Sequence, residues 1–290
     1  MDFKIVTDSS ANLTDEMIER FEITVLPLRF MSDGEEFQSY NEGQKSDLEQ
    51  FYTLMRDGKV FTTSLPYPDK SETAFKKLLD EGNDVLYIGF SSGLSGTYEA
   101  MAGILDSLRK DYPDRKIYHT DTRAAAMGEG LLVYKAALLA EGGASIKEVH
   151  AWVEANKLNL AHWFTVDDLV YLFRGGRVSR TSAWAGSLLN IKPVLHVDNA
   201  GHLIPMEKVR GRKKSIMALA DHMEESAQQP VADQTVFISH GDCKEDADLL
   251  VEELKKRFGC TDIHVHCLDP VIGAHSGPGT LALFFMADAR

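Results

Sequence analysis

The sequence predicts an α/β protein of two domains, and three observations support this fold class. Short apolar segments alternate with amphipathic ones over the first half of the chain, which is typical of a parallel sheet with helices on both faces. Hairpin and mixed patterns replace this alternation later in the chain. The length of 290 residues suits two moderate domains. We therefore expect a parallel, three-layer α/β/α domain at residues 1–155 and a mixed-sheet α/β domain at residues 156–290.

The elements of the first domain follow from apolar spacing and from turn residues. Strands are predicted within residues 3–14, 23–31, 59–68, 84–90 and 115–122. Helices are predicted within residues 15–21, 45–58, 70–82, 97–113 and 124–143. Asn12 or Thr14 is expected to cap the first helix, and a turn is expected at Pro66.

The second domain has a less regular pattern. Residues 162–179, 191–205 and 206–223 predict strands and helices, with a hairpin turn around Asn199-Ala200-Gly201. Residues 235–259 and 262–277 predict a strand–helix–strand unit, whose last loop we place near a cleft.

Composition excludes several classes of function. A net charge of -13 argues against nucleic acid as the main partner and against general adhesion to an anionic membrane. Cys243, Cys260 and Cys267 lack CxxC spacing and are interpreted as reduced thiols of a cytoplasmic protein. The sequence predicts neither a signal peptide nor a transmembrane helix, and it contains no P-loop, HExxH, kinase or zinc-binding pattern. We expect no cofactor and no metal.

A hydroxyl-rich turn follows the buried strand at residues 84–90. In SSGLSGT, a helix starting near Ser95 or Gly96 would leave N–H groups unpaired at its positive end, and Ser92, Ser95 and Thr97 would add donors. This arrangement predicts an anion site at the carboxyl end of a strand. The alternative is an ordinary turn capped by Ser95.

Two similar turns accompany it, VTDSS at residues 6–10 and TTSLP at residues 62–66. If all three strands belong to one parallel sheet, these turns lie along one edge and can converge. Each turn alone is more often an ordinary capped turn.

A second interpretation treats the first turn as a nucleophile elbow. Residues 89–93 match G-x-S-x-G with Ser91 as the nucleophile, and Asp269 and His275 follow in the chain order of a hydrolase triad. No HGGG-like oxyanion loop precedes the motif. A serine hydrolase or esterase therefore stays an alternative.

Other candidate residues lie in the second half of the chain. His275 precedes a rigid Gly277-Pro278-Gly279 turn, which favours a functional role. FRGGRVSR brings Arg174, Arg177 and Arg180 around a glycine pair. Basic residues fill five of the seven positions from 208 to 214, in contrast with the acidic chain; they are Lys208, Arg210, Arg212, Lys213 and Lys214. This basic run predicts a docking patch for an acidic partner or a phosphate, with a solvated helix start as the alternative.

Several of these motifs together resemble one known family. In chain order they are VTDSSANL, TTSLP, SSGLSGTYEA, DTRAAAMGEGLLV, LFRGGRVS, KPVLHVDNAGHL and GAHSGPGTLALFF. They resemble the DegV family of bacterial fatty-acid-binding proteins over nearly the whole chain.

The resemblance implies one long-chain fatty acid buried between two α/β domains, and its presentation to a separate fatty-acid kinase that forms an acyl phosphate. It implies carboxylate contacts at Thr63, His275 and a serine of SSGLSGT, for which Ser95 is favoured and Ser92 stays open. The remaining site residues that it implies are Gly96 beside the carboxylate and Ser64 and Arg174 near the headgroup. Leu65 departs from the glutamine that many members carry before this proline.

These expectations combine into a lipid-binding carrier without a complete catalytic site of its own. Hydroxyl donors and a helix N-terminus suit a carboxylate, and an apolar tunnel suits an acyl chain. The apolar helix at residues 124–140 and the segment at residues 183–191 could line that tunnel. A small-anion-binding protein without a tunnel is a further alternative.

Overall fold

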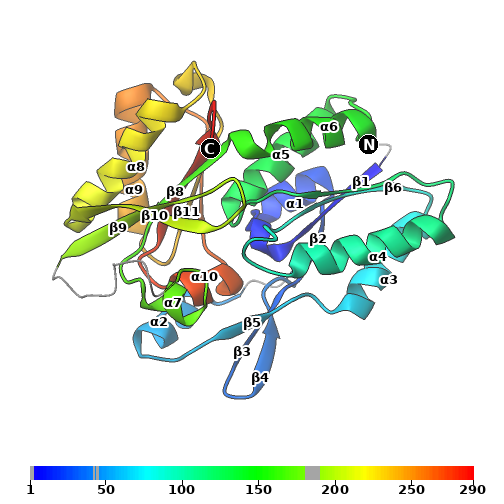
Figure 1. Ribbon diagram of the computed structural model, residues 1–290, viewed down its shortest axis with the longest axis horizontal. Helices are drawn as coiled ribbons and strands as arrows, with labels where there is room; N and C mark the ends of the chain where they lie inside the picture. The colour runs from blue at the N-terminus through cyan, green and yellow to red at the C-terminus, as the bar shows by residue number, and fades with distance from the viewer. Residues whose placement is uncertain (1–2, 42, 44–45, 180–189) are drawn as a thin grey trace.

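The fold consists of two lobes that pack side by side (Figure 1). The computed structural model describes residues 3–41, 43, 46–179 and 190–290. The N-terminal lobe contains a four-stranded sheet and a small three-stranded sheet, and the C-terminal lobe contains a six-stranded sheet.

The four-stranded sheet of the N-terminal lobe is parallel, as the alternating sequence pattern predicts. Its strand order is β2-β1-β6-β7, and every neighbouring pair is parallel. The strands are β1 (Phe3–Asp8), β2 (Thr24–Leu26), β6 (Asp84–Gly89) and β7 (Ile117–Asp121).

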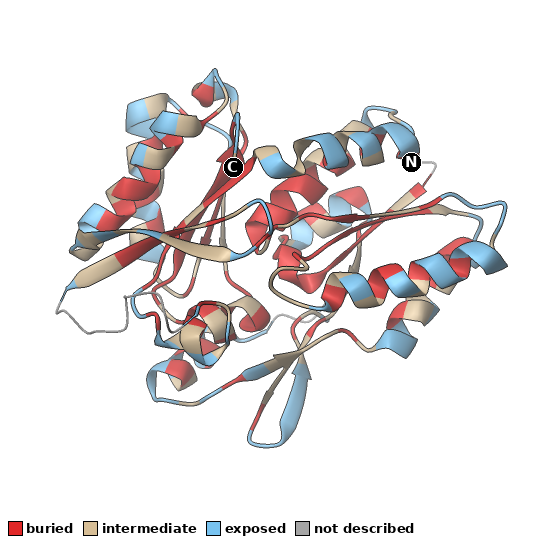
Figure 2. Cartoon of the chain, viewed as in Figure 1, coloured by how far each residue is buried: buried red, intermediate tan, exposed pale blue. Residues whose placement is uncertain are grey.

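Helices cover both faces of the parallel sheet. The outer face packs against α3 (Pro68–Asp80) and α4 (Thr97–Asp111), whose solvent-facing sides are exposed (Figure 2). The inner face packs against α5 (Met127–Glu141) and α6 (Ile146–Asn156), with α1 (Asp15–Phe21) beside α5. Thr14 is the N-cap of α1 and accepts a hydrogen bond from the Met17 N–H, so one of the two predicted caps is confirmed.

The TTSLP segment belongs to a separate antiparallel sheet, which corrects the expected single edge of three turns. This sheet has the order β4-β3-β5. Its strands are β3 (Arg29–Ser32), β4 (Glu35–Gln38) and β5 (Thr62–Ser64), and α2 (Leu48–Arg56) lies between β4 and β5 in the chain. The predicted strand at residues 23–31 divides into β2 and β3 around Pro27, because proline cannot donate a ladder hydrogen bond.

The C-terminal lobe is built on a mixed sheet with the order β10-β9-β8-β13-β11-β12. Only the β11–β12 pair is parallel among its described pairs. Its strands are β8 (Leu160–Thr165), β9 (Ile191–Val197), β10 (Leu203–Arg210), β11 (Val236–His240), β12 (Ile263–Cys267) and β13 (Leu281–Met286). The β9–β10 pair confirms the hairpin predicted around Asn199 to Gly201.

Two long helices cover the outer face of the mixed sheet, and three other helices lie on its inner side. The outer pair is α8 (Arg212–Ser226) and α9 (Lys244–Phe258). The inner helices are α5, α7 (Val170–Arg174) and α10 (Pro270–Ser276). Short 3-10 turns occur at Ser9–Ala11 (η1), Lys157–Asn159 (η2) and Val231–Asp233 (η3). Because α5 contacts strands of both large sheets, it is the central element between the lobes (Figures 1 and 2).

A buried carboxyl network joins α5 to the first strand. Glu129 of α5 is fully buried. Its Oε1 lies 3.1 Å from Thr7 Oγ1, and its Oε2 lies 2.7 Å from Ser10 Oγ. Ser10 Oγ also lies 2.5 Å from Asp8 Oδ1, and Thr7 Oγ1 donates to the Ile88 carbonyl at 2.8 Å. Burial raises the pKa of both carboxyl groups, that of Glu129 well above its usual range.

After α6 the chain passes from the strands of the parallel sheet to those of the mixed sheet, close to residue 155. The domain boundary that we predicted at this residue stays a prediction. In the part of the chain that the structure describes, none of the helices is long and apolar enough to cross a bilayer.

Candidate functional site

A cavity of about 290 Å³ lies between the two lobes, and we call it the first cavity. Both lobes contribute to its wall, which combines apolar and polar residues. The apolar part includes Leu28, Leu65, Phe90, Leu94, Ala125, Ala126, Phe164, Leu172, Val197, Leu203, Leu268, Val271, Ile272, Ala282 and Phe284. The polar part includes Thr63, Ser64, Ser95, Gly96, His162, Arg177, His275, Ser276 and Thr280.

Thr63 and His275 meet in this wall although they are far apart in the sequence. Thr63 lies on β5, opposite Phe30 of β3, and its Oγ1 is 2.7 Å from His275 Nε2. His275 lies in the last turn of α10 and not in the predicted loop. Asp269 caps this helix and Pro270 is its first residue, a combination that favours a helix start.

His275 is held in its neutral form. Burial, and then the positive charges of Arg177 and Arg174, lower its pKa to about 4. Its Nδ1 is buried without a hydrogen-bond partner among the described residues. A Cβ atom on Gly175 would come within 2.2 Å of that nitrogen, so the imidazole packs where only glycine leaves room.

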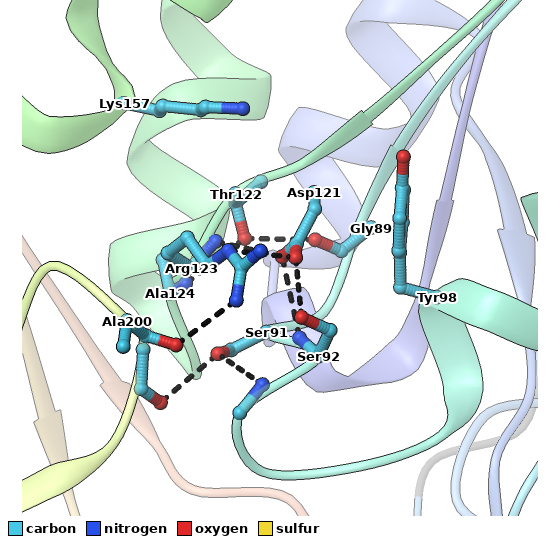
Figure 3. A network of polar contacts seen from close by, with 12 residues as sticks. Gly89, Ser91, Ser92, Tyr98, Asp121, Thr122, Arg123, Ala124, Lys157 and Ala200 are labelled. Carbon is cyan, nitrogen blue, oxygen red and sulfur yellow. Dashed lines mark hydrogen bonds and ion pairs between the residues drawn. The ribbon is translucent and has the colours of Figure 1, made fainter.

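Ser92 and Ser95 lie in the same turn before α4, but their side chains have different surroundings. Ser95 and Gly96 border the first cavity, and Ser95 Oγ lies 2.8 Å from Thr97 Oγ1 at the start of α4. Ser92 points elsewhere, because its Oγ donates to Asp121 Oδ2 at 2.5 Å (Figure 3). Of the two serines left open by the sequence, Ser95 is therefore the one in the cavity wall.

The triad expected of a serine hydrolase is not assembled. Ser91 is fully buried, and its hydroxyl donates to the Gly201 carbonyl at 3.0 Å, across the two lobes (Figure 3). His275 is paired with Thr63, and Asp269 accepts a hydrogen bond from the Ile272 N–H as a helix cap. Because the three side chains have these other partners, the motif at Ser91 is a structural turn.

Of the described arginines in this motif, Arg177 and not Arg174 lies in the cavity wall, and Arg180 lies outside the described residues. Arg174 is exposed at the end of α7, with its guanidinium 5.0 Å from the centre of the Tyr171 ring. Arg177 follows the Gly175-Gly176 turn and donates to the Leu94 carbonyl at 3.2 Å. Burial lowers the pKa of Arg177. The placement of Arg174 near a headgroup thus stays a prediction.

Sequence reasoning missed His162 and Ser276 as cavity residues. His162 of β8 packs edge-on against Phe284 of β13, with the ring centres 4.9 Å apart. Burial lowers its pKa well below the usual range, so its ring is neutral. Ser276 follows His275 directly, and its buried hydroxyl has no partner among the described residues. Of the two tunnel segments predicted, residues 124–140 contribute only Ala125 and Ala126, which directly precede α5, and residues 183–189 lie outside the described part.

The basic run divides into one structural arginine and several exposed side chains. Arg212 is only 20% exposed; it donates to Asp246 at 2.8 Å and to the Gly279 carbonyl at 2.7 Å. The docking role that we predicted for Arg212 is therefore corrected to a structural one. The other basic residues, Lys208, Arg210, Lys213 and Lys214, are exposed.

Comparison with known proteins places this geometry in a family. The family described as "Uncharacterised protein, DegV family COG1307" matches residues 2–288. The chain belongs to the DegV family. A DegV domain-containing protein of Clostridium perfringens is 42% identical over 288 residues, which cover 99% of this chain and 98% of that relative.

Solved DegV structures share the whole fold. A DegV lipid-binding protein from Thermotoga maritima superposes with a TM-score of 0.86 and 30% identity, covering 100% of both chains. DegV from Bacillus subtilis, described as a fatty-acid-binding protein, has a TM-score of 0.83 and 30% identity, covering 99% of this chain and 100% of its own. These DegV relatives confirm the two-lobed α/β fold class and the family predicted from the sequence.

Proposed function

We propose that this DegV-family protein binds one long-chain fatty acid in the first cavity, with the carboxylate at Thr63, Ser95 and His275. The observation that carries the proposal is that one cavity gathers these side chains and the N-terminus of α4. Hydroxyl groups, N–H groups and a neutral imidazole are donors for a carboxylate, and the apolar wall takes the acyl chain. Relatives described as fatty-acid-binding proteins support the same ligand class.

Thr63→Val and Ser95→Ala are expected to weaken fatty-acid binding by roughly 10- to 150-fold. Each variant removes one hydroxyl donor to a charged carboxylate, which is worth about 1.5–3 kcal/mol. Competition against a fluorescent fatty acid measures the affinity. Ser92→Ala is the matched control, because Ser92 lies in the same turn but points to Asp121. Unchanged affinity in both cavity variants would contradict the carboxylate site.

The finer proposal is that the protein carries the fatty acid to a separate kinase and performs no complete reaction alone. The basic run supports a docking surface beside the headgroup. Arg212 donates to the carbonyl of Gly279, which lies between the cavity residues His275 and Thr280 in the chain, and the exposed Lys213 and Lys214 follow Arg212 directly. Positive charges there suit an acidic partner.

Lys213→Glu/Lys214→Glu is expected to slow association with a fatty-acid kinase and to leave fatty-acid affinity unchanged. Rim charges act mainly on the association rate, and their effect falls as salt increases. Surface plasmon resonance at two salt concentrations measures the association and dissociation rates of each variant with the kinase. Lys255→Glu/Lys256→Glu is the control, because it reverses two exposed lysines on the neighbouring helix α9. If the Lys213/Lys214 variant and the Lys255/Lys256 control associate with the kinase at equal rates, the proposed docking surface is contradicted.

A further inference from the structure

A second cavity of about 180 Å³ lies at the carboxyl end of β1. Its wall comes from η1, the start of α1, the segment before α2, and the junction of β12 with α10. In the parallel sheet, β2 lies on one side of β1 and β6 on the other. The chain therefore reverses its winding direction at β1, and open α/β sheets bind ligands in the crevice at such a point.

Two acceptor atoms in residues of this wall are buried and have no donor among the described residues. They are Asn12 Oδ1 and Asp269 Oδ2, on side chains of residues that are 5% and 8% exposed. The Asn12 amide is fixed in orientation, because its Nδ2 donates to the Cys267 carbonyl at 3.1 Å. Asp269 Oδ1 accepts a hydrogen bond from the Ile272 N–H at 2.8 Å, which leaves Oδ2 free. A buried acceptor is normally paired, so both atoms indicate a missing donor.

The charge of the wall selects the kind of donor. Asp8 and Asp15 also border this cavity, and its described wall contains no Lys or Arg. Burial raises the pKa of Asp8 and raises that of Asp269 to about 7, because no positive charge beside them offsets the loss of water. The described residues contain no group of three or more His, Cys, Asp or Glu side chains arranged to hold a metal ion. A bound cation would favour the ionised forms of these carboxyl groups, and carboxyl and amide acceptors without a metal-ligand set suit a cation that carries N–H donors.

The size and the apolar part of the wall select the rest of the ligand. The cavity is several times the volume of one water molecule, which occupies about 30 Å³. Leu13, Ile18, Val25 and Leu48 line it together with the polar residues. An aliphatic stem suits these side chains, and an ammonium head with three donors suits Asn12 and Asp269.

We propose that the second cavity binds a small primary aliphatic amine as its ammonium ion, with Asn12 and Asp269 as acceptors. This site is separate from the first cavity, and its existence does not depend on fatty-acid binding. The two cavities share α10, which begins beside Asp269 and carries His275 in its last turn. The amine is thus bound at one end of the helix whose other end forms the carboxylate site.

Isothermal titration of the full-length protein with n-butylammonium chloride tests the site. We expect saturable binding with one amine per protein, and no binding of tetramethylammonium, which carries the same charge without N–H donors. Asp269→Asn keeps an oxygen for capping α10 but replaces the free acceptor, so binding should weaken at least tenfold. Asp84→Asn is the matched control; Asp84 accepts a hydrogen bond from the Lys116 N–H at the opposite end of the parallel sheet.

Thermal unfolding establishes that both variants fold, and a fluorescent fatty acid reports separately on the first cavity. Absence of saturable n-butylammonium binding to the wild-type protein would overturn the proposal. Equal affinity in wild type and Asp269→Asn, or equal binding of tetramethylammonium, would overturn it as well. The Thr63 and Ser95 variants test only the first cavity, so their fatty-acid affinity does not affect the test of the amine site.

Discussion

Glu129→Ala is expected to lower the free energy of unfolding by about 2–4 kcal/mol, whereas Glu129→Gln should change it little. Thr7 and Ser10 each have one hydroxyl proton, but each hydroxyl lies near two acceptors: Thr7 near the Ile88 carbonyl and Glu129, and Ser10 near Asp8 and Glu129. A protonated Glu129 supplies a missing donor, in agreement with its raised pKa. An amide supplies the same donor, but alanine leaves a cavity and unpaired hydroxyls.

The pH dependence of stability tests the protonation of Glu129 directly. A pKa that is raised in the folded state means that the folded protein holds the proton more tightly than the unfolded chain. This contribution is complete below the unfolded pKa of about 4.3 and is lost as pH rises through the folded pKa. Urea unfolding across pH should therefore show a smaller loss of stability at high pH in Glu129→Gln. An identical pH profile in both proteins would show that Glu129 is ionised.

Arg212→Glu is expected to destabilise the protein by about 2–4 kcal/mol and to weaken fatty-acid binding. The variant removes the hydrogen bonds to Asp246 and Gly279 and places a carboxylate beside Asp246 and Asp167. Because Gly279 belongs to the turn after His275, the carboxylate site is expected to shift as well. Chemical denaturation and fatty-acid competition measure the two effects.

Arg210→Glu is the matched control for Arg212→Glu, since Arg210 is exposed at the end of β10. We expect it to stay within about 0.5 kcal/mol of wild type, as surface substitutions usually do. Equal stability of the two variants would contradict the structural role of Arg212.

Local sequence patterns predicted most of the fold because they depend on near neighbours. Alternating apolar segments identified the parallel strands, and Asn199 to Gly201 identified the hairpin. The position of β5 was predicted wrongly, because its sheet is determined by the break at Pro27 and by pairing with β3. The α10 helix was missed, although the Asp269-Pro270 pair is a recognisable start signal.

The candidate site was predicted only in part. One cavity is lined by Thr63, Ser95, Gly96 and His275, as predicted. This grouping was predicted from the family resemblance and not from the spacing of the residues in the sequence. Arg174 and Arg177 are three residues apart on either side of a glycine pair, and Gly176 has a φ of 74°, so the chain turns before Arg177 enters the wall. Such a turn is not visible in composition. A single acidic residue in the apolar run around Glu129 was a signal that could have identified the buried carboxyl network.

The position of β13 has a consequence for biosynthesis. This strand lies between β8 and β11 in the middle of the mixed sheet, yet it follows every other strand of that sheet in the sequence. A ribosome therefore releases β8 to β12 before the strand that joins them, while the parallel sheet can assemble from residues 3–121 much earlier. Until β13 emerges, the β8 and β11 edges are open to mispairing. The first cavity, with Ala282 and Phe284 in its wall, closes only when β13 is in place.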